Sequence, residues 1–295
     1  IHNFKHQGMG GSEVLQATGL NRDDYYFQYD RLRDNFNPFA INFMKGGIVY
    51  SNFVTTVSPH HAWEAHVGEF GYGLGHTLHI YQDKFRGVLN GIDYDVWNPE
   101  SDRYIPQHYT ADDLAGKAET KTALRDRLLM RDADKPLITF IGRLDDQKGV
   151  HLVHHAIYYC LSKGAQFVLL GSATEAGINA HFQHEKWVLN DNPDCHLELG
   201  FNEELSHLIY AGADMIVVPS NYEPCGLTQM EERNGYVFHQ TDYCALESAL
   251  DRAIGLWYDY HDDFEKLMIQ GMNCDNSWKY PAKDYVEIYE LIRHK

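Results

Sequence analysis

Short apolar runs alternate with amphipathic stretches through the middle of the chain. Each run is bounded by glycine, proline or polar residues, which is typical of buried strands. The predicted strands are residues 136–141, 166–170, 195–199 and 214–218. The predicted helices are residues 149–163, a stretch that ends near Leu189, and residues 203–211, with Asn202 as N-cap. This order of strands and helices predicts an α/β fold with a parallel sheet covered by helices.

The first part of the chain is less regular. Residues 54–58 are predicted to form a strand followed by a helix from about His60, and residues 88–93 a strand that turns into a loop. We place a change of domain near residue 89. Ligands of parallel α/β sheets bind at the carboxyl ends of the strands. The loops to inspect are therefore residues 143–148, 171–174, 200–201 and 221–229.

Composition narrows the classes of partner. The 295 residues suffice for two domains, and no apolar run is long enough to span a bilayer. A net charge of −17 repels nucleic acid and anionic lipid, so we expect neither nucleic acid nor a membrane as partner. A neutral polysaccharide is compatible with this surface. Five scattered cysteines without a CxxC pair indicate a reducing compartment, such as the bacterial cytoplasm or the plastid stroma.

Two cations mark the loop after the first central strand. Arg143 follows the strand, and Lys148 stands at the start of a helix, where the helix dipole disfavours a cation unless an anion is near. A phosphate group would satisfy Arg143, Lys148 and the free helix N–H groups together. In the alternative interpretation, Asp145 and Asp146 neutralise the two cations as a surface cluster. Position alone leaves both readings open.

Glu223 is the candidate carboxylate. It follows the last predicted strand, and Pro224 keeps it out of helical geometry. Beside a sugar phosphate, such a carboxylate can bind hydroxyl groups and offset positive charge in an oxocarbenium-like transition state. The alternative, favoured for a lone carboxylate, is that Glu223 caps the helix that begins near Gly226.

Signals for a metal or a dinucleotide are weak. The 18 histidines include no HExxH pattern, so we expect them to be solvated or packed and predict no metal site. The glycines of residues 8–11 lack a strand–GxGxxG–helix setting, so we predict no dinucleotide cofactor. His2 and Asn90 are polar residues in separate strand-to-loop segments, and each alone is a weak signal.

Longer motifs give a resemblance to a known family. The matching segments are His2-Asn3-Phe4-Lys5-His6-Gln7-Gly8, Phe43-Met44-Lys45-Gly46-Gly47, Thr55-Thr56-Val57-Ser58-Pro59, Val88-Leu89-Asn90-Gly91-Ile92-Asp93, Gly142-Arg143-Leu144-Asp145-Asp146-Gln147-Lys148-Gly149 and Pro219-Ser220-Asn221-Tyr222-Glu223-Pro224-Cys225-Gly226-Leu227-Thr228-Gln229. The chain thus resembles bacterial and plant glycogen and starch synthases, with residues 29–34 closest to cyanobacterial members. These are retaining GT-B glycosyltransferases that use ADP-glucose. Their fold implies two Rossmann-like, doubly wound domains facing a cleft, the N-terminal one incomplete here.

The resemblance implies a role for each candidate residue. His2 contacts the donor glucose, and Asn90 lies beside the sugar at the domain junction. Arg143 and Lys148 hold the diphosphate, and Glu223 supports the transition state. The remaining substrate contacts are Phe201 against adenine and backbone donors around Cys225, Gly226, Leu227 and Thr228.

The chain departs from the family pattern in two places. It lacks the Lys-x-Gly-Gly-Leu donor loop, and Met230 is followed at once by a run, residues 231–238, that resembles a segment well downstream. We therefore expect segments to be missing at the start and at the 230/231 join.

Three domain segments and one activity are predicted. Residues 1–89 are the remainder of the acceptor-side domain, residues 90–276 the nucleotide-sugar domain, and residues 277–295 a helix that crosses back to the first domain. The predicted activity is transfer of glucose from ADP-glucose to an α-1,4-glucan or maltooligosaccharide. The alternatives are a related transferase that uses UDP-glucose and a catalytically silent glucan-binding or priming scaffold.

Overall fold

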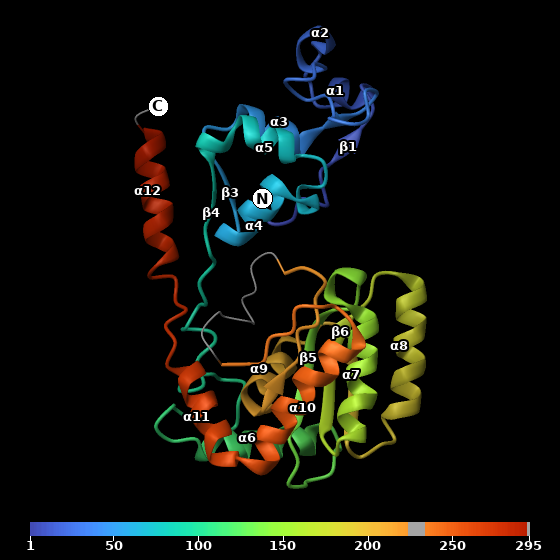
Figure 1. Cartoon of the computed structure of the whole chain (residues 1–295), viewed down its shortest axis with the longest axis vertical. Coiled ribbons are helices and arrows are strands. Elements are labelled where there is room, and N and C mark those ends of the chain that lie inside the picture. Colours follow the sequence, from blue (N-terminus) through green and yellow to red (C-terminus); the bar gives the residue numbers. More distant parts are fainter. Residues whose placement is uncertain (224–233, 294–295) are drawn as a thin grey trace. The chain divides into compact units, whose positions relative to one another are not determined.

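A computed structural model describes residues 1–223 and 234–293. The chain divides into two compact units, residues 1–92 with 277–295, and residues 93–276. Figure 1 shows the elements of both units along the chain. Each unit is described below by itself.

The first unit holds two small sheets and several short helices. Its strands are β1 (Met9–Gly10), β2 (Ile41–Asn42), β3 (Val54–Thr56) and β4 (Phe85–Gly87). Its helices are α1 (Glu13–Ala17), α2 (Asp23–Tyr26), α3 (Phe43–Tyr50), α4 (Pro59–Val67), α5 (Gly75–Ile80), α12 (Pro281–Arg293) and the 3-10 turns η1 (Glu69–Gly71) and η2 (Gln82–Lys84). The β3–β4 pair is parallel and the β1–β2 pair antiparallel.

The sequence places one strand of this unit wrongly. The strand expected at residues 88–93 is β4, at Phe85–Gly87, and the ladder ends where Val88 N donates to Thr56 O at 2.8 Å. Arg86 and Gly87 gave little strand signal. The predicted strand therefore began at the apolar residues Val88 and Leu89, which follow them. Gly87 is required here, since a Cβ at this position would lie 1.9 Å from the Ser58 carbonyl oxygen. The strand predicted at residues 54–58 is confirmed over Val54–Thr56 as β3, and Ser58, counted as strand in the prediction, instead caps α4 by accepting from His61 N.

The second unit is built on a four-stranded parallel sheet in the order β7-β6-β5-β8. Its strands are β5 (Leu137–Arg143), β6 (Gln166–Ser172), β7 (Cys195–Leu199) and β8 (Met215–Ile216). Its helices are α6 (Ala115–Arg127), α7 (Val150–Ser162), α8 (Ala176–Leu189), α9 (Glu203–Gly212), α10 (Tyr243–Asp259), α11 (His261–Met272) and the 3-10 turn η3 (Asp146–Lys148). The strand–helix order predicted for this region is confirmed, with Asn202 accepting from Leu205 N as the N-cap of α9.

Helices on both faces explain why these strands are continuous apolar runs. Ile138, Phe140, Phe167 and Leu169 share a core with residues of α7, α8 and α10. The alternate residues Leu137, Val168 and Leu170 share a core with residues of α6 and α9. Strand β8 is shorter than the predicted residues 214–218, although Val217 N still donates to Thr139 O before Pro219 ends the pairing.

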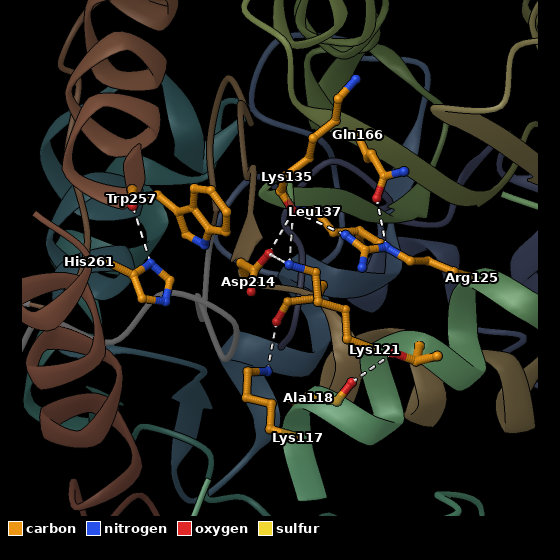
Figure 2. A network of polar contacts seen from close by, with 12 residues as sticks. Lys117, Ala118, Lys121, Arg125, Lys135, Leu137, Gln166, Asp214, Trp257 and His261 are labelled. Carbon is orange, nitrogen blue, oxygen red and sulfur yellow. Dashed lines mark hydrogen bonds and ion pairs between the residues drawn. The ribbon is translucent and has the colours of Figure 1, made fainter. Parts of the chain in front are cut away.

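Buried polar groups fix the amino end of this sheet, as Figure 2 shows. Asp214 Oδ2 accepts from Lys121 Nζ at 2.6 Å and from Leu137 N at 2.7 Å. Lys117 Nζ donates to the carbonyl oxygens of Ala211 and Ala213, and Arg125 Nε donates to Gln166 Oε1. Helix α6 is thereby tied to β5, β6 and the start of β8. These contacts occupy the amino end of the sheet, whereas the candidate residues Arg143, Lys148 and Glu223 lie at or after the carboxyl ends of its strands.

Candidate functional site at the carboxyl edge of the parallel sheet

The loop after β5 is held by hydrogen bonds within itself. Asp145 Oδ1 accepts from Lys148 N at 3.0 Å and caps η3, while Asp145 Oδ2 lies 2.9 Å from Arg143 Nη1. Arg143 Nη2 also donates to Gln147 Oε1 at 3.3 Å. The Arg143 side chain is half exposed, and a guanidinium has five N–H donors, so it can bind an anion while keeping these contacts.

Gly149 brings this loop against the segment that follows β8. Its φ of +66° is left-handed, and a Cβ would lie 2.0 Å from the Pro219 carbonyl oxygen. Two hydrogen bonds join the same segments, from Asn221 N to Gln147 O at 2.9 Å and from Asn221 Nδ2 to Asp146 O at 2.5 Å. The motif of residues 142–149 and the motif that begins at Pro219 are therefore one structural unit, although about 70 residues separate them.

Lys148 and Glu223 meet at this junction. Lys148 Nζ donates to Glu223 Oε2 at 2.6 Å, and Ser220 Oγ donates to the same oxygen at 3.0 Å. The two side chains keep 22% and 17% of their surface exposed, so both groups can reach a ligand after a small movement. The alternative interpretation, in which nearby aspartates neutralise both cations, holds for Arg143, which pairs with Asp145. It does not hold for Lys148, whose side chain pairs with Glu223.

A cavity of about 200 Å³ opens farther along the same edge of the sheet. Its lining residues come from the ends of β5, β6 and β7 and from α8: Leu144, Ser172, Ala173, Asn179, Phe182, Gln183, Leu199 and Gly200. Asn179 and Gln183 were not among the residues predicted from the sequence. Their spacing of four residues on the helix after β6 was the available signal, because it places both amides on one face of α8.

Phe201 follows this cavity in the chain. It comes directly after Gly200, whose N donates to Gly171 O at 2.8 Å, and its side chain is 89% exposed. An exposed phenylalanine at the ligand edge of a sheet offers a ring face for stacking. Cys225, Gly226, Leu227 and Thr228, and the helix that Glu223 was expected to cap, lie outside the described residues.

His2 and Asn90 belong to the first unit. His2 is exposed beside β3, where the preceding residue donates from its backbone nitrogen to Thr55 O at 2.6 Å. Asn90 is half-buried three residues beyond β4, and a Cβ on the adjacent Gly91 would lie 2.5 Å from Trp278 N. The structure thus brings Arg143, Lys148 and Glu223 together in the second unit, and anchors His2 and Asn90 near the β3–β4 pair in the first.

The first unit also has an open cavity of about 470 Å³. Its lining residues are Tyr29, Asn35, Phe36, His66, Val67, Gly68, Gly73, Gly75 and His76. Four aromatic or imidazole rings beside an amide form a surface on which sugar rings can stack and donate hydrogen bonds.

Comparison with known proteins decides the family. Residues 1–80 match the starch synthase catalytic domain, and residues 127–233 match the glycosyl transferases of group 1. Glycogen synthase 1 of Synechococcus sp. (strain JA-3-3Ab) is 66% identical over 327 residues, which cover 100% of this chain and 67% of that protein. The chain belongs to the glycogen and starch synthase family.

Two further relatives agree with this assignment. Glycogen synthase 1 of Trichormus variabilis is 64% identical, with 100% of this chain and 66% of that protein covered. The catalytic domain of starch synthase IV from Arabidopsis thaliana, bound to ADP and acarbose, superposes with a TM-score of 0.96 at 36% identity, covering 100% of this chain and 66% of that one. The resemblance and the GT-B fold predicted from the motifs are confirmed.

The chain spans about two thirds of the length of these curated relatives. The 327 aligned positions exceed its 295 residues, so the relatives also carry residues that this chain lacks. Among the described residues, no helix combines the length and the apolar character needed to cross a bilayer.

Proposed function

We propose that this protein transfers glucose from ADP-glucose to the non-reducing end of an α-1,4-glucan with retention of configuration. The observation that carries the proposal is the contact between Lys148 and Glu223, beside Arg143, at the carboxyl edge of the parallel sheet. This contact brings two cations and a carboxylate to one place. The cations suit a negatively charged leaving group, and the carboxylate suits the sugar attached to it. The family assignment supports it, and so do the ADP and acarbose in the Arabidopsis structure.

The second unit supplies the donor site in this proposal. Arg143 and Lys148 bind the diphosphate, and their charges stabilise it as it leaves. Phe201 stacks against the adenine, next to the cavity lined by Asn179 and Gln183. The family resemblance also assigns substrate contacts to residues 225–228, which lie outside the described residues.

Glu223 has two tasks in the reaction. Its carboxylate accepts hydrogen bonds from glucose hydroxyl groups, and its negative charge favours positive charge at the anomeric carbon. When the diphosphate takes over the ammonium of Lys148, the Glu223 oxygen that now accepts from Lys148 becomes available to the sugar.

The bond changes need no protein nucleophile. The 4-hydroxyl of the acceptor's terminal glucose attacks the anomeric carbon from the face that the diphosphate leaves, and a leaving phosphate oxygen takes the hydroxyl proton. This geometry retains the α configuration with one carboxylate, unlike the pair of carboxylates used by most glycosidases.

We assign the acceptor side to the first unit. His2 contacts the donor glucose and Asn90 lies beside the sugar, as the family resemblance implies. The aromatic cavity at Tyr29 and Phe36 is a surface for the glucan chain. We place the protein in the bacterial cytoplasm, given its bacterial relatives.

The test is incorporation of labelled glucose from ADP-glucose into glycogen by the full-length protein, with UDP-glucose assayed beside it. We expect faster incorporation from ADP-glucose. Faster incorporation from UDP-glucose would replace the proposed donor. Binding of maltooligosaccharide without any transfer would identify a silent glucan-binding scaffold instead.

A further inference from the structure

Three metal-binding side chains gather between α7 and α8, away from the site described above. His154 comes from α7, and His181 and Glu185 come from α8. One ligand atom of each lies within 4.8 Å of the others. The two helices run side by side in Figure 1, and the contact of 3.5 Å between His154 Nε2 and Glu185 Oε1 joins them.

Glu185 is a buried carboxylate, with 6% of its surface exposed. Burying an ionised carboxylate is costly unless a cation or several donors compensate it. Its Oε2 accepts from the Tyr158 hydroxyl at 2.6 Å. Its Oε1 faces His154, which is charged only when protonated.

Tyr158 orients this carboxylate as groups behind a metal ligand commonly do. By holding Oε2, it leaves Oε1 directed toward the imidazole of His154.

The histidine on α8 completes the set. His181 and Glu185 are four residues apart, which puts them on the same face of the helix. The His181 ring lies 4.8 Å from the His154 ring, centroid to centroid, and its side chain is exposed, so an ion can enter from solvent. Asn179 and Gln183 lie on the opposite face of α8, where they line the cavity of about 200 Å³.

We propose that His154, His181 and Glu185 form a binding site for one divalent first-row transition metal ion. Zn²⁺ is the ion used to test it. Two imidazoles and a carboxylate suit Zn²⁺, whereas Ca²⁺ and Mg²⁺ require oxygen ligands. The bound ion compensates the buried charge of Glu185. It also fastens α7 to α8 and thereby fixes the helix that lines the cavity.

Binding requires a modest contraction of the site. Tetrahedral Zn²⁺ with bonds of about 2.0–2.1 Å holds its ligand atoms about 3.4 Å apart. The present separations of up to 4.8 Å therefore close by rotation of the two histidine side chains. Three protein ligands leave the fourth position to a water molecule.

The experiment measures Zn²⁺ affinity of the chelator-treated full-length protein by competition with a chromophoric chelator. A chelator of high Zn²⁺ affinity keeps the ion from the weak sites that the other histidines form, so only a tight site on the protein is measured. We expect one tight site in the wild type, with affinity reduced roughly 10- to 100-fold or more in both His154→Gln and His181→Ala, and about 10-fold in Tyr158→Phe. Co²⁺ bound in place of Zn²⁺ should show the visible absorption of a four-coordinate ion in the wild type and lose it in His181→Ala.

His184→Ala is the matched control. His184 is an exposed histidine of the same helix, stacked on Trp187 and outside the cluster. Its variant should bind Zn²⁺ as the wild type does, and a thermal shift on adding Zn²⁺ should persist in it and vanish in His181→Ala. Equal affinity in the wild type and His181→Ala, or loss of binding in His184→Ala alone, would overturn the proposal. Because His181 is exposed, its variant tests the site without removing a buried group.

Discussion

Lys148 donates a hydrogen bond to Glu223 over 2.6 Å, joining the loop after β5 to the segment after β8. The cation that we assign to the diphosphate and the carboxylate that we assign to the sugar are thus partners of each other in this structure. A pair of this kind holds both groups in place and exchanges them for ligand contacts when the donor binds.

The cations should be needed for turnover. We expect Arg143→Ala and Lys148→Ala each to lower kcat roughly 100-fold or more, because each removes a charge that stabilises the leaving diphosphate. Initial rates with ADP-glucose and glycogen measure this. Lys163→Ala, at the far end of α7 and paired with Asp251, is the control and should keep the wild-type rate. A wild-type rate in Arg143→Ala or Lys148→Ala would remove that residue from the phosphate site.

The Lys148–Glu223 pair should also be visible in stability. A double-mutant cycle with Lys148→Met and Glu223→Gln should give a coupling free energy of about 1 kcal/mol, since both groups are partly buried and hydrogen-bonded. Urea unfolding of the four proteins measures it. Additive effects of the two substitutions would show that the pair contributes nothing to the fold.

Gly149 should resist substitution. Gly149→Ala places a Cβ 2.0 Å from the Pro219 carbonyl oxygen in a left-handed backbone, so we expect a loss of roughly 1–3 kcal/mol of stability and a lower kcat. Gly255→Ala, in α10 with open space around its Cβ, should be neutral or stabilising by up to about 1 kcal/mol. The prediction fails if thermal unfolding ranks the two variants in the reverse order.

Phe201 should affect the donor and not the fold. Phe201→Ala should raise the KM for ADP-glucose roughly 5- to 100-fold, the range expected when a base loses its stacking partner. Its melting temperature should be unchanged, because the ring is 89% exposed. Trp187→Ala removes another exposed ring, on α8, and should leave KM unaltered. An unchanged KM in Phe201→Ala would argue against adenine stacking.

Lys117 should make stability depend on pH. Burial, the largest cause, lowers its pKa from 10.5 to about 8 in the folded protein. Between these values the unfolded chain binds the additional proton, so stability due to Lys117 rises with pH over this window, by up to roughly 3 kcal/mol. The neutral amine still donates to Ala211 O and Ala213 O. The stability difference between the wild type and Lys117→Met should therefore grow from about pH 7.5 to about pH 10 in urea unfolding, and a constant difference would contradict it.

The sequence alone determined the local elements of the second unit and its ligand edge. Strands 166–170 and 195–199 and the helix capped by Asn202 follow from local periodicity and capping chemistry. Because parallel strands end at one edge of a sheet, the same pattern also pointed to Arg143, Lys148 and Glu223. It failed at β4, where Arg86 and Gly87 gave no strand signal and pairing with β3 decided the structure.

Only the tertiary structure decided which charges meet. Asp145, Asp146 and Glu223 were all available to Lys148 in the sequence, and the close approach of Gly149 to Pro219 selected Glu223. In the same way, His154 lies 27 residues before His181, and no spacing rule linked them until α7 and α8 packed on one face of the sheet. Periodicity acts over one turn or one strand, whereas contacts between distant residues depend on how whole elements pack.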